Sequence, residues 1–138
     1  MKVLYTATAH ATGDGRNGHV TSEDGLVDSD LRIPKEMGGA GGAPNPELLF
    51  AAGYAACFHS ALKLVAGQGK LDVTGSEVTA SVGIGQTGSG GYGLTVELLV
   101  LIPGLERGEA ETLAARAHEV CPYSNATRGN IPVTVTVA

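Results

Sequence analysis

The sequence is poor in aromatic residues and in positive charge. Tryptophan is absent, Phe and Tyr together make up 4 % of 138 residues, and 9 Lys and Arg stand against 14 Asp and Glu, a net charge of −5. Because the few basic residues form no stripe along a face, nucleic acid and anionic membrane surfaces are unsuitable partners. With so few rings, the core has to be built from Ala, Val, Leu and Ile.

Cysteine is equally scarce, with only Cys57 and Cys121 in the chain. Two cysteines are too few for the disulfide framework of a small secreted protein. Residues 1–10 carry one Lys and no apolar core of a signal peptide, so we expect a cytoplasmic protein. In that compartment a disulfide is usually transient, and either catalytic or redox-sensing. The question of function therefore starts from these two thiols.

Glycine, in contrast, is abundant, with 21 residues in the chain. The glycines are not periodic and the segments between them are apolar, which excludes a collagen-like or disordered chain. The length suits one domain over residues 1–138, which would bury roughly two-thirds of the surface of its unfolded chain. Folding then needs neither a disulfide nor a structural metal.

The first third of the chain has the pattern of a β-meander. Residues 3–8 alternate as in a strand, and Asp-Gly and Asn-Gly turn pairs follow at 14–18. Two more short strands are expected around residues 19–22 and 25–28. A Pro- and Gly-rich stretch at 34–44 then predicts a long loop.

A long helix follows, with a clear start signal. Asn45 is a suitable N-cap, Pro46 fits the first helical position, and Glu47 places an acid at the positive end of the helix dipole. Nearly every residue from Leu48 to Ala66 is apolar or small, which predicts burial on all sides. Small residues, one His and one Lys make the stretch a poor membrane span. Because one chain of this size can hardly surround such a helix, we expect a homodimer.

The remaining elements complete an α+β fold. Alternating residues at 78–84 and 94–102 predict a long hairpin, and residues 106–120 predict an amphipathic helix that Pro122 stops. Residues 131–137 alternate again and should close the sheet. Strands grouped around two helices, with no βαβ rhythm, are typical of the α+β class.

The two cysteines differ in their predicted surroundings. Cys57 lies within the buried helix, where a free cysteine commonly serves as a small hydrophobic residue. Cys121 falls where a helix ends, in a polar stretch, so packing explains it less well. An inert thiol beside a turn remains open for Cys121.

Zinc binding is one alternative for these thiols. The pairs Cys57-x-His59 and His118-x-x-Cys121 offer four nitrogen and sulfur ligands. Positions i and i+2 of a helix diverge by roughly 200°, so Cys57 and His59 cannot face one ion while both are helical. His59 is then expected to be a hydrogen-bonded core or interface residue, and His118 an ordinary residue at a helix C-terminus.

Redox chemistry at Cys57 requires a thiolate, and an apolar site in the middle of a helix raises the pKa of a thiol. The helix dipole fades within the first turn, so a cationic side chain has to approach. Arg16 is the best candidate, because the glycines around it allow a tight loop to present the guanidinium inward. Taken alone, Arg16 would be a solvated turn residue and Glu47 a first-turn acid that stabilises its helix.

Four segments of the chain carry a recognisable pattern. They are Gly15-Arg16-Asn17-Gly18, the loop from Gly38 to Gly42, Asn45-Pro46-Glu47-x-x-Phe50-Ala51-Ala52-Gly53-Tyr54-x-x-Cys57-Phe58, and Cys121-Pro122-Tyr123-Ser124-x-Ala126-Thr127-Arg128-Gly129-Asn130. Together they resemble the organic hydroperoxide resistance (Ohr) branch of the Ohr/OsmC family, over essentially the full chain. The end of the last segment is closer to Ohr than to its OsmC sister.

The resemblance implies an intertwined α+β homodimer, with an antiparallel-rich sheet wrapped around two central helices. It also implies a thiol peroxidase with no metal and no prosthetic group. By position, Cys57 would be the peroxidatic cysteine and Cys121 the resolving one, joined as a disulfide during turnover. Arg16 and Glu47 would be the polar pair that activates Cys57 and orients the peroxide.

The same resemblance implies a substrate and a partner. Organic (alkyl and fatty-acid) hydroperoxides would be reduced to alcohols as a defence against oxidative stress. A dihydrolipoyl group on a lipoylated protein, or another dithiol, would regenerate the thiols. Phe50, Tyr54 and Tyr123 lie near the cysteine blocks and are candidates to line an apolar substrate pocket, which would favour organic hydroperoxides over hydrogen peroxide.

Helix geometry adds one expectation. Ten residues of straight helix separate Glu47 and Cys57 by ~15 Å and put them on different faces. If both serve one site, either the helix breaks near Gly53 or the site is assembled across the dimer interface.

Three other functions remain open. The disulfide could signal, as in a redox sensor, although the acidic chain offers no DNA-binding surface. The protein could be a structural or ligand-binding dimer in which both cysteines are core residues, which predicts slow and similar reactivity of the two thiols. Within enzymes, an OsmC-type peroxidase is the alternative.

Overall fold

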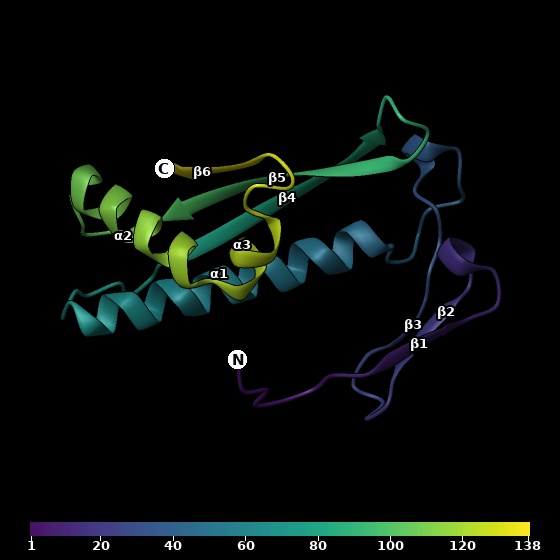
Figure 1. Cartoon of the computed structure of the whole chain (residues 1–138), viewed down its shortest axis with the longest axis horizontal. Helices are drawn as coiled ribbons and strands as arrows, with labels where there is room; N and C mark the ends of the chain where they lie inside the picture. Colours follow the sequence, from purple (N-terminus) through teal and green to yellow (C-terminus); the bar gives the residue numbers. More distant parts are fainter. The chain divides into compact units, whose positions relative to one another are not determined.

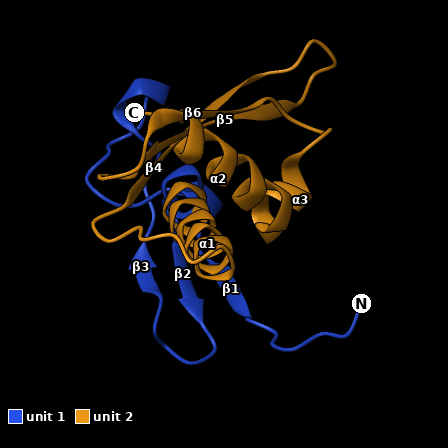
Figure 2. Ribbon diagram, turned by 90° about the vertical axis from the view of Figure 1, so that its left-hand side faces the viewer, with its two compact units in different colours: residues 1–49 blue, residues 50–138 orange.

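The computed structural model describes all residues from Met1 to Ala138. The chain divides into two compact units, Met1–Leu49 and Phe50–Ala138 (Figure 2). Each unit contains its own three-stranded sheet. The single domain expected over residues 1–138 remains a prediction.

The first unit is built on an antiparallel sheet in the order β1-β2-β3 (Figure 1). The predicted strand at residues 3–8 is wrong, because these residues are exposed and pairing begins only at Ala9. The third strand starts at Asp28, since Gly25 adopts φ +76° in the turn before it, a conformation that suits glycine. The elements are β1 (Ala9–Thr12), the 3-10 turn η1 (Gly15–Asn17), β2 (His19–Ser22), β3 (Asp28–Asp30) and η2 (Lys35–Met37).

The second unit has a sheet in the order β4-β5-β6. The predicted hairpin is confirmed, with β4 (Glu77–Gln86) antiparallel to β5 (Tyr92–Leu101). The last strand, β6 (Val133–Val137), pairs in parallel with β5. The helices are α1 (Pro46–Gln68), which begins in the first unit and continues through the second, α2 (Arg107–Val120) and α3 (Pro122–Thr127).

The start of α1 follows the sequence signal. Pro46 is its first residue, and the Asn45 side-chain oxygen accepts the backbone N–H of Leu48 at 2.8 Å, which makes Asn45 the N-cap. The helix runs without interruption to Gln68. The predicted break near Gly53 is therefore wrong, and assembly of the site across two subunits remains as the other prediction.

Burial on all sides of α1 is not achieved within one chain. The helix is long and apolar enough to cross a membrane by length and composition, a test that the core helix of a globular protein also passes. Leu64 is 57 % exposed on one side. The buried residues form a single stripe at helical spacing, comprising Tyr54, Phe58, Ala61, Leu62, Val65 and Ala66.

The core of the second unit lies between its helices and one face of its sheet (Figure 2). Along β5, Val96, Leu98 and Val100 are buried, while Leu99 and Leu101, which alternate with them, are exposed, as expected for a strand with one packed face. The helices α2 and α3 pack against each other, and α2 packs against β6. Few rings are needed, because Ala110, Ala114 and Ala117 let α2 approach closely.

The sequence pattern misses α3. Pro122 does end α2, as predicted, but it is also the first residue of α3. Proline suits this position because its missing N–H is one that a helix start leaves unpaired. The two helices meet at Cys121, which is therefore held by defined backbone rather than by a loop.

Candidate functional site

The structure brings Cys57 and Cys121 together. Their Sγ atoms lie 3.8 Å apart and both thiols are free. Cys121 is fully buried, whereas Cys57 is partly exposed. A disulfide needs its sulfurs at about 2.05 Å, so a modest shift would join them. Solvent can therefore reach the Cys57 thiol, whereas the Cys121 thiol is buried next to it.

Cys121 sits at the junction of two helices. Its N–H donates to the carbonyl of Ala117 at 2.9 Å, which closes the last turn of α2, and its carbonyl accepts the N–H of Asn125 at 2.9 Å, which opens α3. Its backbone is extended, with φ −65° and ψ 122°. Both neighbouring elements therefore fix the position of its sulfur.

The environment of Cys57 within its own unit does not favour a thiolate. Burial raises the pKa of the Cys57 thiol, and Cys121 raises it further. The backbone N–H of Tyr123 donates to the Cys57 sulfur and opposes this rise, since a hydrogen bond to the charged form favours it. The N–H does not outweigh burial, so a peroxidatic role for Cys57 requires a cation.

Arg16 and Glu47 form a two-point ion pair in the first unit. Arg16 Nη1 donates to Glu47 Oε2 at 2.8 Å, and Nη2 lies 2.7 Å from Oε1. The Glu47 side chain is only 11 % exposed, and the hydrogen bond from Arg16 holds the pKa of its carboxyl below the usual range. The expected pairing of these two residues is confirmed, while their role towards Cys57 stays a prediction.

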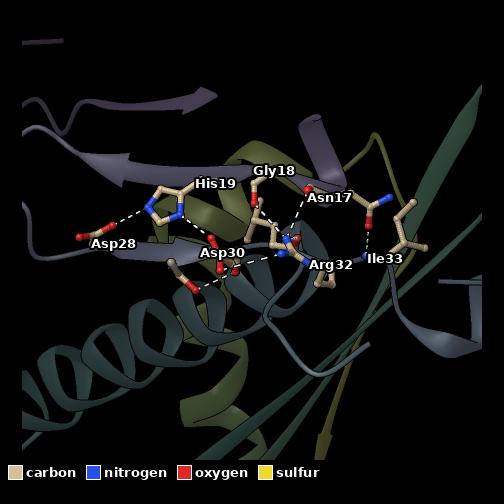
Figure 3. A network of polar contacts seen from close by, with 9 residues as sticks. Asn17, Gly18, His19, Asp28, Asp30, Arg32 and Ile33 are labelled. Carbon is tan, nitrogen blue, oxygen red and sulfur yellow. Dashed lines mark hydrogen bonds and ion pairs between the residues drawn. The ribbon is translucent and has the colours of Figure 1, made fainter. Parts of the chain in front are cut away.

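The turn that carries Arg16 is fixed at its base. Leu31 N–H donates to the carbonyl of Gly18 at 2.9 Å, and Ile33 N–H donates to the Asn17 side-chain oxygen at 3.0 Å. Arg32 Nη1 donates to the carbonyls of Asn17 and Gly18 at 3.3 and 3.4 Å (Figure 3). Gly18 has no room for a side chain, since a Cβ there would lie 2.2 Å from the carbonyl oxygen of Thr12.

A charged cluster extends this base along β2 and β3. His19 Nδ1 lies 2.8 Å from Asp30 Oδ1, and His19 Nε2 lies 2.5 Å from Asp28 Oδ1 (Figure 3). Arg32 Nη2 lies 3.9 Å from the other oxygen of Asp30. The hydrogen bonds that His19 makes to Asp30 and Asp28 raise the pKa of His19, and the bond from His19 lowers the pKa of Asp30. No local sequence pattern predicts this cluster, because its members meet only when β2 and β3 pair.

Three aromatic rings gather beside the cysteines. The ring centroids of Phe50, Tyr54 and Tyr123 lie 5.5 to 5.9 Å apart in all three pairs. Phe50 and Tyr123 line an open, mostly apolar groove of about 390 Å³ together with Pro122, Ala126 and Thr127. Tyr54 does not line it, because its side chain is completely buried. The predicted aromatic pocket thus has two of its three expected rings.

The histidines near the cysteines have other partners. His59 Nε2 lies 2.9 Å from Ser76 Oγ, which confirms a hydrogen-bonded histidine. His118 Nδ1 lies 2.8 Å from Ser124 Oγ, and burial, with Arg128 nearby, lowers the pKa of His118. His118 is therefore more than an ordinary residue at a helix end. No group of three or more His, Cys, Asp or Glu side chains is placed to hold a metal ion.

Sequence reasoning also missed Ser124 and Thr127. Both are buried polar residues on α3, and both contact the hydroxyl of Tyr54. The signal for them was present as two hydroxyl residues at i and i+3 after Cys121, a spacing that shares one helix face. The sequence alone does not reveal this face, because Pro122 indicates the end of one helix and not the start of α3.

The fold and these side chains define a class of protein: an α+β chain with a pair of adjacent free thiols, one buried and one partly exposed. Comparison with known proteins identifies the family of this chain. The family model described as OsmC-like protein matches residues 39–136. The chain belongs to this OsmC-like family.

The relatives point to one branch of the family. The chain is 58 % identical to an organic hydroperoxide resistance protein of Xanthomonas axonopodis pv. citri (strain 306), over 99 % of this chain and 96 % of the relative. A crystal structure of an organic hydroperoxide resistance protein from Elizabethkingia anophelis, with thiocyanate bound, is 57 % identical with a TM-score of 0.95, covering 100 % of this chain and 99 % of the other. The structure of OhrB of Bacillus subtilis is 43 % identical with a TM-score of 0.90, covering 99 % and 100 %. The resemblance to the Ohr branch is confirmed.

Proposed function

We propose that the protein is a thiol peroxidase that reduces organic hydroperoxides to alcohols and so defends the cell against oxidative stress. The observation that carries the proposal is the pair of free thiols 3.8 Å apart, with Cys57 partly exposed and Cys121 buried. This difference in exposure suits a Cys57 thiol that reacts with peroxide and a Cys121 thiol that reacts only with oxidised Cys57. The names of the relatives support the substrate class.

In the first step the Cys57 thiolate attacks the peroxide oxygen distal to the organic group. A sulfur–oxygen bond forms, the oxygen–oxygen bond breaks, and the alkoxide takes a proton and leaves as an alcohol. Cys57 is oxidised to a sulfenic acid and the hydroperoxide is reduced. The Tyr123 N–H is placed to stabilise the attacking thiolate.

Arg16 supplies the cation that the first step requires. It stabilises the Cys57 thiolate and orients the peroxide, and Glu47 holds the guanidinium in place through two contacts. The hydrogen bond from Arg16 lowers the pKa of Glu47 further below neutral pH, so the carboxylate is ionised there. The supporting observation is that this ion pair is formed, with its acid mostly buried.

In the second step the Cys121 thiol condenses with the sulfenic acid. A sulfur–sulfur bond forms and water leaves, which protects Cys57 from irreversible oxidation. An external dithiol, such as a dihydrolipoyl group on a lipoylated protein, then reduces the Cys57–Cys121 disulfide by exchange and becomes a disulfide itself. The cycle uses no metal and no prosthetic group.

The organic part of the substrate binds in the groove beside the cysteines. Phe50 and Tyr123 give it an apolar wall, which would favour alkyl and fatty-acid hydroperoxides over hydrogen peroxide. The wall belongs to α1 and α3, the same elements that carry Cys57 and follow Cys121.

The working protein is a cytoplasmic homodimer that acts as one domain per chain. The exposed apolar residues on α1 and on the outer face of β5, Leu64, Leu99 and Leu101, support a partner surface. Since α1 is unbroken, assembly of the site from two subunits is the form of the proposal that the helix allows. Sedimentation should give the mass of two chains, and the mass of one chain would contradict the dimer.

The decisive experiment compares consumption of cumene hydroperoxide and of hydrogen peroxide, with dihydrolipoamide as reductant. Wild type should turn over rapidly and prefer the organic peroxide. Cys57→Ser should lose turnover, and Cys121→Ser should react once and then stall or over-oxidise. Ser76→Ala is the control, since it removes a buried hydroxyl whose hydrogen-bond partner is His59 and neither thiol. Equal and slow loss in wild type and both cysteine variants would mean that the thiols are packing residues.

A further inference from the structure

A chain of hydrogen bonds crosses the core behind the two cysteines. Tyr54 Oη lies 2.9 Å from Ser124 Oγ and 3.0 Å from Thr127 Oγ1, and Ser124 Oγ lies 2.8 Å from His118 Nδ1. Tyr54 and Ser124 are completely buried and Thr127 is 6 % exposed. Apart from these residues only Ser76 is a buried polar residue, and the apolar core is built mostly from Ala, Val and Leu.

The donors and acceptors of this chain can all be satisfied in one direction. Thr127 Oγ1 donates to the carbonyl of Tyr123 at 3.0 Å, so it accepts from Tyr54. Tyr54 then accepts from Ser124, and Ser124 accepts from the Nδ1–H of His118. No buried side-chain nitrogen or oxygen is left without a partner. This chain of hydrogen bonds runs from His118 at the end of α2 to the carbonyl of Tyr123 in α3.

Its members stand next to the reactive groups in the sequence. Tyr54 lies three residues before Cys57 on α1, and His118 lies three residues before Cys121 on α2. Ser124 lies three residues after Cys121 on α3. The chain therefore ties together the three helices that carry or adjoin the two sulfurs. The carbonyl at its end belongs to Tyr123, the residue whose N–H donates to Cys57.

Stability alone does not require this network. Replacing a buried polar network by apolar residues of similar volume is often neutral or stabilising, whereas a satisfied network fixes one geometry. The geometry in question here is the placement of α3 against α1. That placement sets the distance between the sulfurs and the direction of the Tyr123 N–H.

We infer that the Tyr54–Ser124–Thr127 hydroxyls, with His118, position α3 so that Cys121 captures the Cys57 sulfenic acid before a second peroxide does. The inference rests on the proposed function. Two reactions compete for the sulfenic acid. Condensation with the Cys121 thiol gives the disulfide and water, while a second hydroperoxide transfers an oxygen atom and gives a sulfinic acid and an alcohol. These residues act through Cys121, so they are positioning residues, and they set the ratio of the two products.

The test removes single hydroxyls with little change of shape, in the full-length reduced protein. Tyr54→Phe and Thr127→Val each delete one hydroxyl of the chain, and Thr127→Ser keeps it. Val65→Ala is the control, because it weakens the same buried face of α1 without touching the network. Each protein is mixed with one equivalent and with a tenfold excess of cumene hydroperoxide, quenched with an alkylating reagent, and analysed by mass spectrometry for disulfide and sulfinic acid.

We expect Tyr54→Phe and Thr127→Val to form the disulfide about tenfold more slowly, because a small misplacement of reacting groups costs this much or more. Under excess peroxide they should accumulate sulfinic acid at Cys57. The first oxidation of Cys57 should change much less in Tyr54→Phe and should be unchanged in Val65→Ala. Thr127→Ser and Val65→Ala should both keep the wild-type ratio of disulfide to sulfinic acid. The inference fails if the two deletions give the wild-type ratio of disulfide to sulfinic acid, or if Val65→Ala shifts that ratio as much. Failure of wild type itself to oxidise Cys57 would instead refute the proposed function.

Discussion

At the scale of single residues, the central feature is the two-point contact between Arg16 and Glu47. Both guanidinium nitrogens reach the carboxylate at 2.7 and 2.8 Å, so the plane of the guanidinium is fixed and not only its charge. Lysine would keep the charge but lose this fork. Replacing Arg16 by lysine therefore tests the geometry of the contact while the positive charge is kept.

Arg16→Lys should oxidise Cys57 more slowly than wild type. Losing one charge-assisted hydrogen bond removes about 1.5–3 kcal/mol, which corresponds to roughly a 10- to 100-fold lower rate. Single-turnover kinetics with cumene hydroperoxide measure the rate of Cys57 oxidation. Arg116→Lys, on the exposed face of α2, is the control. A wild-type rate in Arg16→Lys would show that the fork has no role.

The same pair has a defined pH dependence. Arg16 lowers the pKa of Glu47 in the folded protein, so the pair contributes stability above the ordinary pKa of glutamate and loses it as the pH falls through the lowered value. The contribution is therefore intact at neutral pH, where the proposed reaction takes place.

At the scale of elements, sequence patterns predict what local chemistry decides. The cap at Asn45 and the end of α2 follow from side chains within a few residues of each other. The hairpin of β4 and β5 follows from the alternation along each strand and the glycine-rich turn between them. The strand expected at residues 3–8 fails because pairing needs a neighbouring edge, which a local pattern does not supply. The short α3 is missed because proline both stops a helix and starts one.

In the candidate site, too, local motifs could be predicted from the sequence and contacts between distant residues could not. The cysteine blocks and the Arg16 turn are long motifs, so both the thiols and the ion pair could be identified from sequence. The hydroxyl chain and the cluster around His19 could not, since their members lie far apart in sequence or on paired strands. The length of one helix predicts either a break near Gly53 or a site shared by two subunits, and helix length alone does not decide between them; the structure excludes the break, because α1 is continuous.

Gly53 has a different role, because it allows Tyr123 to lie against α1. A Cβ at Gly53 would stand 2.8 Å from the Tyr123 hydroxyl and 3.3 Å from its ring. Since Tyr123 is 37 % exposed, it can swing outward, and the helix itself gains from alanine. Gly53→Ala should therefore leave the fold intact but reshape the groove.

The expected result for Gly53→Ala is a kcat/KM for cumene hydroperoxide about tenfold lower, as misfits of one methyl group commonly produce. The smaller tert-butyl hydroperoxide should be less affected. Gly67→Ala is the matched control on the same helix, because a Cβ there meets no atom within 4 Å. Equal values for both peroxides in Gly53→Ala and Gly67→Ala would mean that Tyr123 does not shape the substrate site.

At the scale of the whole molecule, two histidines give the stability opposite dependences on pH. The pKa of His19 is raised by Asp30 and Asp28, and Arg32 faces the same cluster from the next segment. The pKa of His118 is lowered by burial, with Arg128 adding to the effect and Glu119 opposing it. The folded protein thus favours the proton on His19 and disfavours it on His118.

The signs follow from proton linkage. For His19, the folded state binds more protons than the unfolded state between the ordinary histidine pKa and the raised one, so its stabilisation is present at low pH and lost as the pH rises through that window. For His118, the unfolded state binds more protons below the ordinary value, so stability falls as the pH falls towards the lowered pKa. Stability should therefore decrease on both sides of a region near pH 6.5.

Two substitutions separate these contributions. His19→Asn should lower the Tm more at pH 5.5 than at pH 9, because only the protonated ring bridges the two carboxylates. Ser29→Ala, on the same strand as Asp28 and Asp30, is the control and should lower the Tm equally at both pH values. His118→Gln should remove part of the loss of stability below pH 6.5, because an amide side chain has no proton to release when it is buried. A His19→Asn defect that is the same at pH 5.5 and pH 9 would show that the ring acts by packing, and the cluster in Figure 3 would then have no electrostatic role.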